Sequence, residues 1–184
     1  MPLQNDLVKT ANKKQKFTLE HARELQRCMD DPLYFLENFY YIQHPTQGKL
    51  KYVPYEFQKD LINSYHNHRF SVNLLGRQLG KTTTAAGYLL WYAMFIPDST
   101  ILIAAHKFTG TQEIMARVRY GYECCPDHIR AGVLTYNKHS IEFENKSRII
   151  AQTTTETTGR GLSISLLYCD ELSFVAPHKA TEFW

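Results

Sequence analysis

A glycine-containing run between two apolar segments constrains the fold of this chain more than any other feature. The run is Gly76-Arg-Gln-Leu-Gly-Lys-Thr-Thr83. It follows the short apolar segment Phe70–Leu75, which predicts a buried strand, and it opens an apolar stretch that ends at about Phe95, before Pro97. A strand, a glycine loop and a helix in this order are the context in which a loop binds phosphate groups.

The side chains of this loop suit a nucleotide and its metal ion. The ammonium of Lys81 would lie on the β- and γ-phosphates, and the hydroxyl of Thr82 would face Mg²⁺. Three residues separate the two glycines, where four are usual. Gly80 lets the backbone come close to the ligand, and N–H groups at the helix terminus would face phosphate oxygens. We therefore expect ATP and Mg²⁺, with the nucleotide contacted by Gly76, Arg77, Gln78, Gly80, Lys81, Thr82 and Thr83.

A pair of carboxylates near the end of the sequence complements this loop. Asp170 and Glu171 directly follow the apolar run Ser165–Cys169, which predicts a buried strand. At a strand end, Asp170 would help to hold the metal ion, together with Thr82. Glu171 would orient and deprotonate the attacking water. A solvated turn after a strand is the simpler interpretation of the pair, but Lys81 upstream favours the catalytic one.

Two arginines and one glutamine are further candidates for the site. Arg77 lies inside the loop, and Arg160 lies in the run Thr158-Gly-Arg-Gly161. A guanidinium near the γ-phosphate stabilises charge in the transition state, so both are candidate catalytic groups, with an exposed surface charge as the alternative for Arg160. Gln58 follows the aromatic Phe57, and its amide offers the donor and the acceptor that an adenine edge requires.

The remaining pattern predicts an α/β fold. Helices are expected from Thr18 to about Arg27, from Asp31-Pro32 through an aromatic-rich stretch to Ile42, and from Pro54 to Tyr65. Buried or short strands are expected at Thr100–Ala105, Val133–Tyr136, Ser140–Phe143 and Ile149–Ala151. Strands alternating with helices indicate a mostly parallel sheet flanked by helices. We expect a mobile polar arm over residues 1–16 and one domain over residues 17–184.

Composition adds little about partners. The formal net charge of +3 over 184 residues is too small to demonstrate a nucleic-acid partner. Four cysteines form no CxxC pair, and the neighbours Cys124 and Cys125 are better explained as ordinary thiols than as metal ligands with His106 or His128. Free thiols fit a reducing compartment, and no long apolar span predicts a membrane segment.

These residues resemble one known family. The run Leu75–Thr83, with its shortened glycine spacing and internal arginine, looks like the phosphate loop of the large terminase subunit of T-even-type tailed bacteriophages. The helix Pro54–Tyr65, with Phe57 and Gln58, is similar to the adenine-recognition segment of that family. The arginine in Thr158–Gly161 and the acidic strand end after Leu166 resemble its other site motifs. The resemblance covers about residues 30–184.

The resemblance implies a motor that uses ATP to package double-stranded DNA into a procapsid. It implies a RecA-like P-loop NTPase fold, a portal protein and a small terminase subunit as partners, a homo-oligomeric ring and the host cytoplasm. The family also implies a coupling motif on the next strand and a C-terminal nuclease. Because Trp184 comes soon after Glu171, we expect a piece of a longer protein whose core sheet is incomplete.

Two other functions remain open at this point. A superfamily-two helicase or translocase also combines a glutamine motif, a phosphate loop and a strand ending in Asp-Glu, although Asp170-Glu-Leu-Ser173 lacks the usual helicase continuation. A nucleotide-binding assembly module without turnover is the second alternative, and the presence of Glu171 argues against it.

Overall fold

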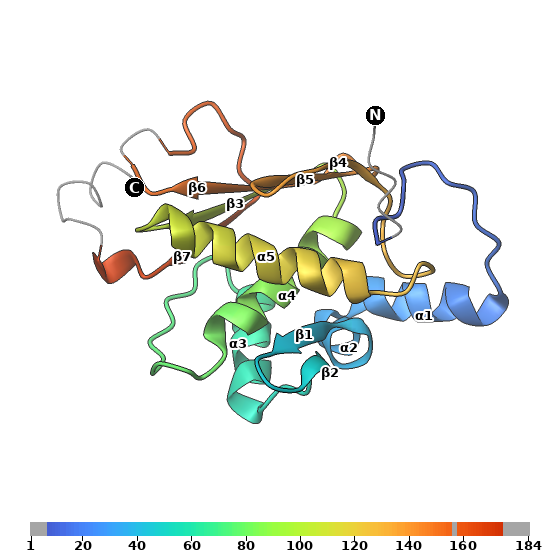
Figure 1. Ribbon diagram of the computed structural model, residues 1–184, viewed down its shortest axis with the longest axis horizontal. Helices are drawn as coiled ribbons and strands as arrows, with labels where there is room; N and C mark the ends of the chain where they lie inside the picture. The colour runs from blue at the N-terminus through green and yellow to red at the C-terminus, as the bar shows by residue number, and fades with distance from the viewer. Residues whose placement is uncertain (1–6, 156–157, 175–184) are drawn as a thin grey trace.

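The computed structural model describes residues 7–155 and 158–174 (Figure 1). Its α-helices are α1 (Leu19–Asp30), α2 (Pro32–Phe39), α3 (Glu56–Asn67), α4 (Lys81–Phe95) and α5 (Phe108–Cys124), and a short 3₁₀ helix covers Leu172–Phe174. The strands are β1 (Tyr41–His44), β2 (Gly48–Lys51), β3 (Thr100–Ala105), β4 (Val133–Tyr136), β5 (Ser140–Phe143), β6 (Arg148–Thr153) and β7 (Leu166–Asp170). The α/β class expected from the sequence is confirmed.

Local chemistry explains where the first two helices begin. Thr18 caps α1, because its Oγ1 accepts a hydrogen bond from the His21 backbone N–H at 3.1 Å. Asp31 caps α2 through its Oδ1, which accepts from the Leu33 N–H at 2.8 Å, and Pro32 occupies the first helical position. Both starts agree with the sequence prediction.

The large sheet is mixed, which corrects the expectation of a mostly parallel one. Its strand order is β4-β5-β6-β3-β7, and only the pairs β6–β3 and β3–β7 are parallel. The pairs β4–β5 and β5–β6 are antiparallel. The connections at 137–139 and 144–147 are too short for the crossover that a parallel pair needs, so these strands form hairpins.

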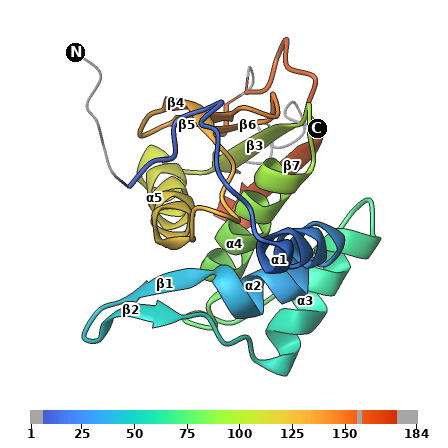
Figure 2. The ribbon, with the colours of Figure 1, turned by 90° about the vertical axis from the view of Figure 1, so that its right-hand side faces the viewer.

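The helices lie on one side of this sheet. In Figures 1 and 2, α4 and α5 lie directly beneath the strands, and α1, α2 and α3 lie farther away on the same side. From Thr84 to Phe95 every residue of α4 except Tyr92 is buried, so this helix is surrounded by the core. The strand β3 is buried over its whole length. Among the described residues, no helix is both long and apolar enough to cross a bilayer.

The strand expected at Phe70–Leu75 is not formed. This segment pairs with no strand in the described part of the chain, and the side chains of Val72 and Leu74 are fully exposed. An apolar run becomes a strand only where a neighbouring strand supplies ladder partners, and the local pattern carries no information about such a neighbour. The run that precedes the glycine loop is therefore a connection without regular secondary structure between α3 and α4.

A hairpin that the sequence prediction missed follows α2. The strands β1 and β2 pair antiparallel, with Tyr41 opposite Lys51 and His44 opposite Gly48. The predicted second helix therefore ends at Phe39 instead of continuing to Ile42. The turn residues after His44, including Pro45 and the positive-φ Gly48, were the available signal.

The N-terminal segment is partly attached to the sheet. Thr10 forms a parallel bridge with Val133, and the Val133 N–H donates to the Lys9 carbonyl at 2.9 Å. The Lys9 ammonium donates to the carbonyls of Asp127 and Arg130, each at 3.0 Å. These contacts attach the residues around Lys9 and Thr10 to the domain, and the mobility of the arm stays a prediction. The part of the arm before residue 7 lies outside the described residues.

Candidate nucleotide site

The loop at residues 76–83, called the glycine loop below, ends in a helix terminus open to an anion. Gly80 is the N-cap of α4 and has a φ of 73°, a left-handed conformation that suits glycine. The first helical hydrogen bond runs from the Thr84 N–H to the Gly80 carbonyl at 2.9 Å. The N–H groups of Lys81, Thr82 and Thr83 have no backbone acceptor among the described residues. Such groups, together with the helix dipole, form an anion-binding site.

The acidic strand end meets this terminus. The Lys81 ammonium lies 3.2 Å from Asp170 Oδ1, and the Thr82 hydroxyl donates to Asp170 Oδ2 at 3.4 Å. Asp170 is the last residue of β7 and pairs in register with Ala105 at the end of β3. Ligands of α/β proteins bind at the carboxyl ends of parallel strands, and this edge is such a place. The structure thus brings Asp170 together with Lys81 and Thr82, although 88 residues separate Thr82 from Asp170.

Two partly buried tyrosines are influenced by the carboxylate of Asp170. Burial raises the pKa of Tyr65 and of Tyr168, and the negative charge of Asp170 raises both further. Both phenols therefore stay neutral across the physiological range. Asp170 itself is largely shielded, since its side chain is 15% exposed while that of Lys81 is 35% exposed.

Glu171 differs from Asp170 in both conformation and exposure. Its φ of 54° is left-handed, which is strained for a residue with a Cβ. Its side chain is exposed and has no hydrogen-bond partner within the described ranges. The backbone turns here, since the Phe174 N–H donates to the Glu171 carbonyl at 3.0 Å. Strained residues next to a binding edge are frequent at functional sites.

The other loop and arginine candidates are not assembled around Asp170. Gly76, Arg77 and Gln78 are exposed, and Gln78 has a left-handed φ of 63°. Arg160 is exposed between Gly159 and Gly161, both of which have positive φ. Neither guanidinium makes an ion pair with a carboxylate in the described part of the chain. Their proximity to a nucleotide stays a prediction.

Gln58 is a support of the glycine loop. It is 5% exposed, and its Nε2 donates to the Leu79 carbonyl at 2.9 Å. Its Oε1 accepts from the Tyr55 N–H at 3.0 Å and from the Tyr52 hydroxyl at 3.2 Å. Because Oε1 and one N–H of Nε2 are already hydrogen-bonded within the protein, only the second N–H of Nε2 is left for the predicted contact with adenine. The adjacent rings of Tyr55 and Phe57 are stacked at 5.8 Å and partly exposed.

A second support of the loop was not predicted. The Tyr52 hydroxyl lies 2.6 Å from Thr84 Oγ1, which donates to the Gly80 carbonyl at 3.1 Å. Tyr52 follows β2, so the hairpin is linked to the N-terminus of α4. Burial raises the pKa of Tyr52 to about 12, which keeps the hydroxyl available as a donor. These contacts join residues far apart in the chain, so the local sequence pattern does not predict them.

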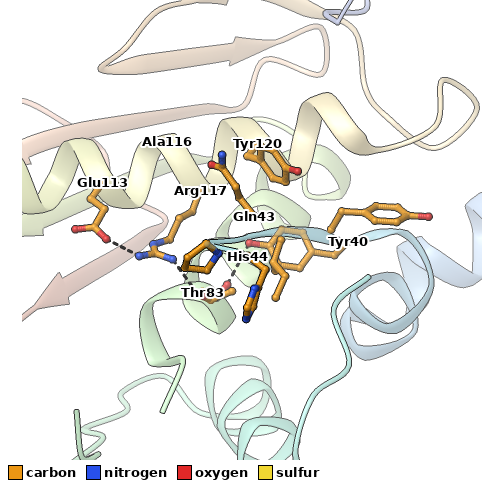
Figure 3. A pocket seen from close by; sticks show the side chains of 11 residues that line it. Tyr40, Gln43, His44, Thr83, Glu113, Ala116, Arg117 and Tyr120 are labelled. Atoms are coloured by element: carbon orange, nitrogen blue, oxygen red, sulfur yellow. Dashed lines mark hydrogen bonds and ion pairs between the residues drawn. The ribbon is translucent and has the colours of Figure 1, made fainter. Parts of the chain in front are cut away.

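Thr83 is held at two atoms, next to a cavity of about 420 Å³ (Figure 3). Its carbonyl accepts from the Tyr40 hydroxyl at 3.2 Å, and its Oγ1 accepts from Arg117 Nη1 at 3.2 Å. Arg117 comes from α5 and also pairs with Glu113. The cavity lies between β1 and α5, and Thr83 and Arg117 line it. The sequence prediction included Thr83 but neither Tyr40 nor Arg117.

The donor set at this edge suits a small, hard cation bound together with a nucleotide. In the described ranges, no three His, Cys, Asp or Glu side chains gather as a protein-only metal site would. Mg²⁺ in nucleotide sites takes few protein ligands, with phosphate oxygens and water completing its shell. The Asp170 carboxylate and the neighbouring Thr82 hydroxyl supply oxygen donors of this kind.

The comparison with known families agrees with this geometry. Residues 72–184 match the family model for the N-terminal region of the large terminase subunit of T4likevirus type. The matched range begins just before the glycine loop and includes Lys81, Asp170 and Arg160. The chain therefore belongs to the T4likevirus-type large terminase subunit family, whose members take part in viral DNA packaging.

Proposed function

We propose that this chain is the ATP-hydrolysing part of a motor that packages double-stranded viral DNA into a procapsid. The observation that supports the proposal most strongly is the contact of Lys81 and Thr82 with Asp170, 3.2 and 3.4 Å apart, at an open helix terminus. A P-loop nucleotide site needs an ammonium, a hydroxyl and a carboxylate at one strand edge. Family membership favours packaging over the helicase alternative.

Lys81 has two successive partners in this proposal. Without nucleotide its ammonium is paired with Asp170. With Mg·ATP, the ammonium would contact the β- and γ-phosphates, and Asp170 and Thr82 would hold Mg²⁺, which would supply positive charge against the phosphates. The ion pair therefore keeps both charges compensated until the ligand supplies replacements. Its net stabilisation of the fold is small, because Lys81 is about one-third exposed.

Glu171 is the proposed general base. Its exposed carboxylate directly follows the metal-binding residue, so it can hydrogen-bond the water that attacks the γ-phosphate. Arg77 and Arg160 are the proposed stabilisers of transition-state charge. Both lie on exposed glycine-flanked segments that can adjust when the ligand binds, and in a ring the second acts on the nucleotide of a neighbouring subunit.

The remaining loop residues would bind the rest of the nucleotide. The backbone of Gly76, Gln78, Gly80 and Thr83 would bind the phosphates, and the left-handed conformations of Gln78 and Gly80 are of the kind that forms anion-binding turns. Gln58 would contact the adenine edge with its free N–H, beside the exposed Phe57 ring.

The proposed partners follow from the packaging function. They are double-stranded DNA, a portal protein, a small terminase subunit and further copies of this chain in a ring, in the host cytoplasm. The cation requirement of the site is Mg²⁺, and its ligand is ATP.

Two substitutions test the proposal by calorimetric titration with Mg·ATP and by phosphate release. Lys81→Ala is expected to abolish binding, because the phosphates lose their only loop ammonium. Glu171→Gln is expected to keep binding but remove hydrolysis. Unchanged phosphate release by Glu171→Gln would refute the assignment of the base, and unchanged binding by Lys81→Ala would refute the site.

A further inference from the structure

Arg117 contacts the first turn of α4 from outside the glycine loop. Its Nη1 donates to Thr83 Oγ1 at 3.2 Å, and its other amine pairs with Glu113, one turn earlier on α5. Figure 3 shows the guanidinium between these two partners, beside the cavity under β1. Thr83 is one of the residues whose N–H lacks a backbone acceptor in the described part of the chain.

The position of this cation is unfavourable for a protein without a ligand. The N-terminus of a helix carries partial positive charge, so a guanidinium near the first turn of α4 is repelled. Glu113 compensates it only partly, because the side chain of Glu113 is 65% exposed and screened by water. An anion at the same terminus would reverse the sign of the interaction. Stability of the fold alone therefore does not explain why Arg117 lies here.

We infer that Arg117 is a positioning residue for nucleotide binding, a role that rests on the proposed function. Its hydrogen bond fixes the Thr83 side chain, while the Tyr40 hydroxyl holds the Thr83 carbonyl at 3.2 Å. The two contacts hold Thr83 in place, and its N–H is the last one of the turn without a backbone acceptor among the described residues. The guanidinium also adds positive potential without touching the ligand itself.

The same helix offers a matched control. Arg119 pairs with Glu123 at the same spacing of four residues, and its guanidinium lies over the Tyr136 ring, 4.8 Å from the centroid. Arg119 lines neither the cavity nor the first turn of α4. Like Arg117→Ala, Arg119→Ala removes a helical ion pair and an arginine side chain from α5. Unlike Arg117→Ala, it leaves the contact between Arg117 and Thr83 in place.

The test measures the Kd of Mg·ATP by calorimetry for both arginine variants. Arg117→Ala is expected to raise the Kd about tenfold, the effect of one charge-assisted hydrogen bond. Arg117→Lys, which keeps the charge but cannot bond Glu113 and Thr83 in the same forked geometry, is expected to give an intermediate Kd. Arg119→Ala is expected to keep the Kd of the unsubstituted chain.

A double-mutant cycle tests whether Arg117 influences nucleotide binding through its contact with Thr83. Arg117→Ala is expected to weaken binding fully in a Thr83→Ser background, where the hydroxyl remains, and to have a smaller effect in a Thr83→Val background, where only the positive potential of the guanidinium is lost. Equal Kd values for Arg117→Ala and Arg119→Ala would overturn the inference, as would a full effect of Arg117→Ala in the Thr83→Val background. Absence of binding by the unsubstituted chain would instead contradict the proposed function.

Discussion

Replacing Tyr52 by phenylalanine tests the link between the β1–β2 hairpin and the glycine loop. The substitution keeps the aromatic ring, which packs edge-to-face on Tyr40 at 5.5 Å, and removes only the hydroxyl. That hydroxyl is buried and lies between Thr84 Oγ1 at 2.6 Å and Gln58 Oε1 at 3.2 Å. The change therefore isolates one polar group in the support of the loop.

The expected loss follows from counting protons among these contacts. The Tyr52 hydroxyl has a single proton, which it can donate either to Gln58 Oε1 or to Thr84 Oγ1, while the Thr84 hydroxyl donates to the Gly80 carbonyl. Gln58 Oε1 keeps its bond from the Tyr55 N–H. Tyr52→Phe would thus remove one hydrogen bond and strand no donor, so we expect a loss of about 1 kcal/mol in the free energy of unfolding. For a chain of this size that corresponds to a fall in Tm of about 2–4 °C.

Urea denaturation and amide hydrogen exchange measure this effect. Tyr88→Phe is the matched control, since Tyr88 is also a buried tyrosine, within α4, and its hydroxyl donates to the Tyr65 carbonyl at 3.3 Å. Tyr52→Phe is expected to speed exchange of the Thr84 amide, which bonds Gly80, whereas Tyr88→Phe is not. A free-energy change below about 0.3 kcal/mol, or exchange equally fast in both variants, would refute the reasoning.

Two further predictions concern the core. Gly121→Ala is expected to destabilise the fold by about 1–3 kcal/mol in urea denaturation, because the added Cβ would collide with the buried Tyr40 ring. Gly110→Ala on the same helix is the control. Its Cβ would meet only an ordinary contact at 3.5 Å, so this variant is expected to be neutral or stabilising. The free energy of unfolding is also expected to fall as pH rises above about 10. Burial raises the folded-state pKa of Tyr52 to about 12 and that of Tyr40 further. In this pH range the folded state therefore binds more protons than the unfolded chain. Unfolding midpoints that stay constant between pH 10 and 12 would contradict this linkage.

The predictions from sequence succeeded where the determinants are local. The starts of α1 and α2 depend on Thr18 and Asp31 followed by Pro32, and these signals lie within a few residues of each helix. The contact of Lys81 and Thr82 with Asp170 was also expected, since these residues belong to two motifs with recognisable contexts, while their roles toward a nucleotide stay predictions.

The failures concern interactions between distant segments. The run Phe70–Leu75 has the composition of a buried strand, but whether it pairs depends on a neighbour that its own residues do not specify. The supports of the glycine loop, Tyr52 and Arg117, lie 32 and 34 residues from their threonine partners. Gln58 was recognised, but its place under Leu79 emerges only when α3 packs beside the loop.

The burial of α4 has a mechanical consequence. The helix that begins at the glycine loop is enclosed by core side chains from Thr84 to Phe95, and close-packed interiors have low compressibility. A displacement of the loop along the helix axis therefore cannot be absorbed by a soft layer beneath it. A force on the glycine loop would therefore be transmitted through α4 to the rest of the domain, with little deformation of the helix.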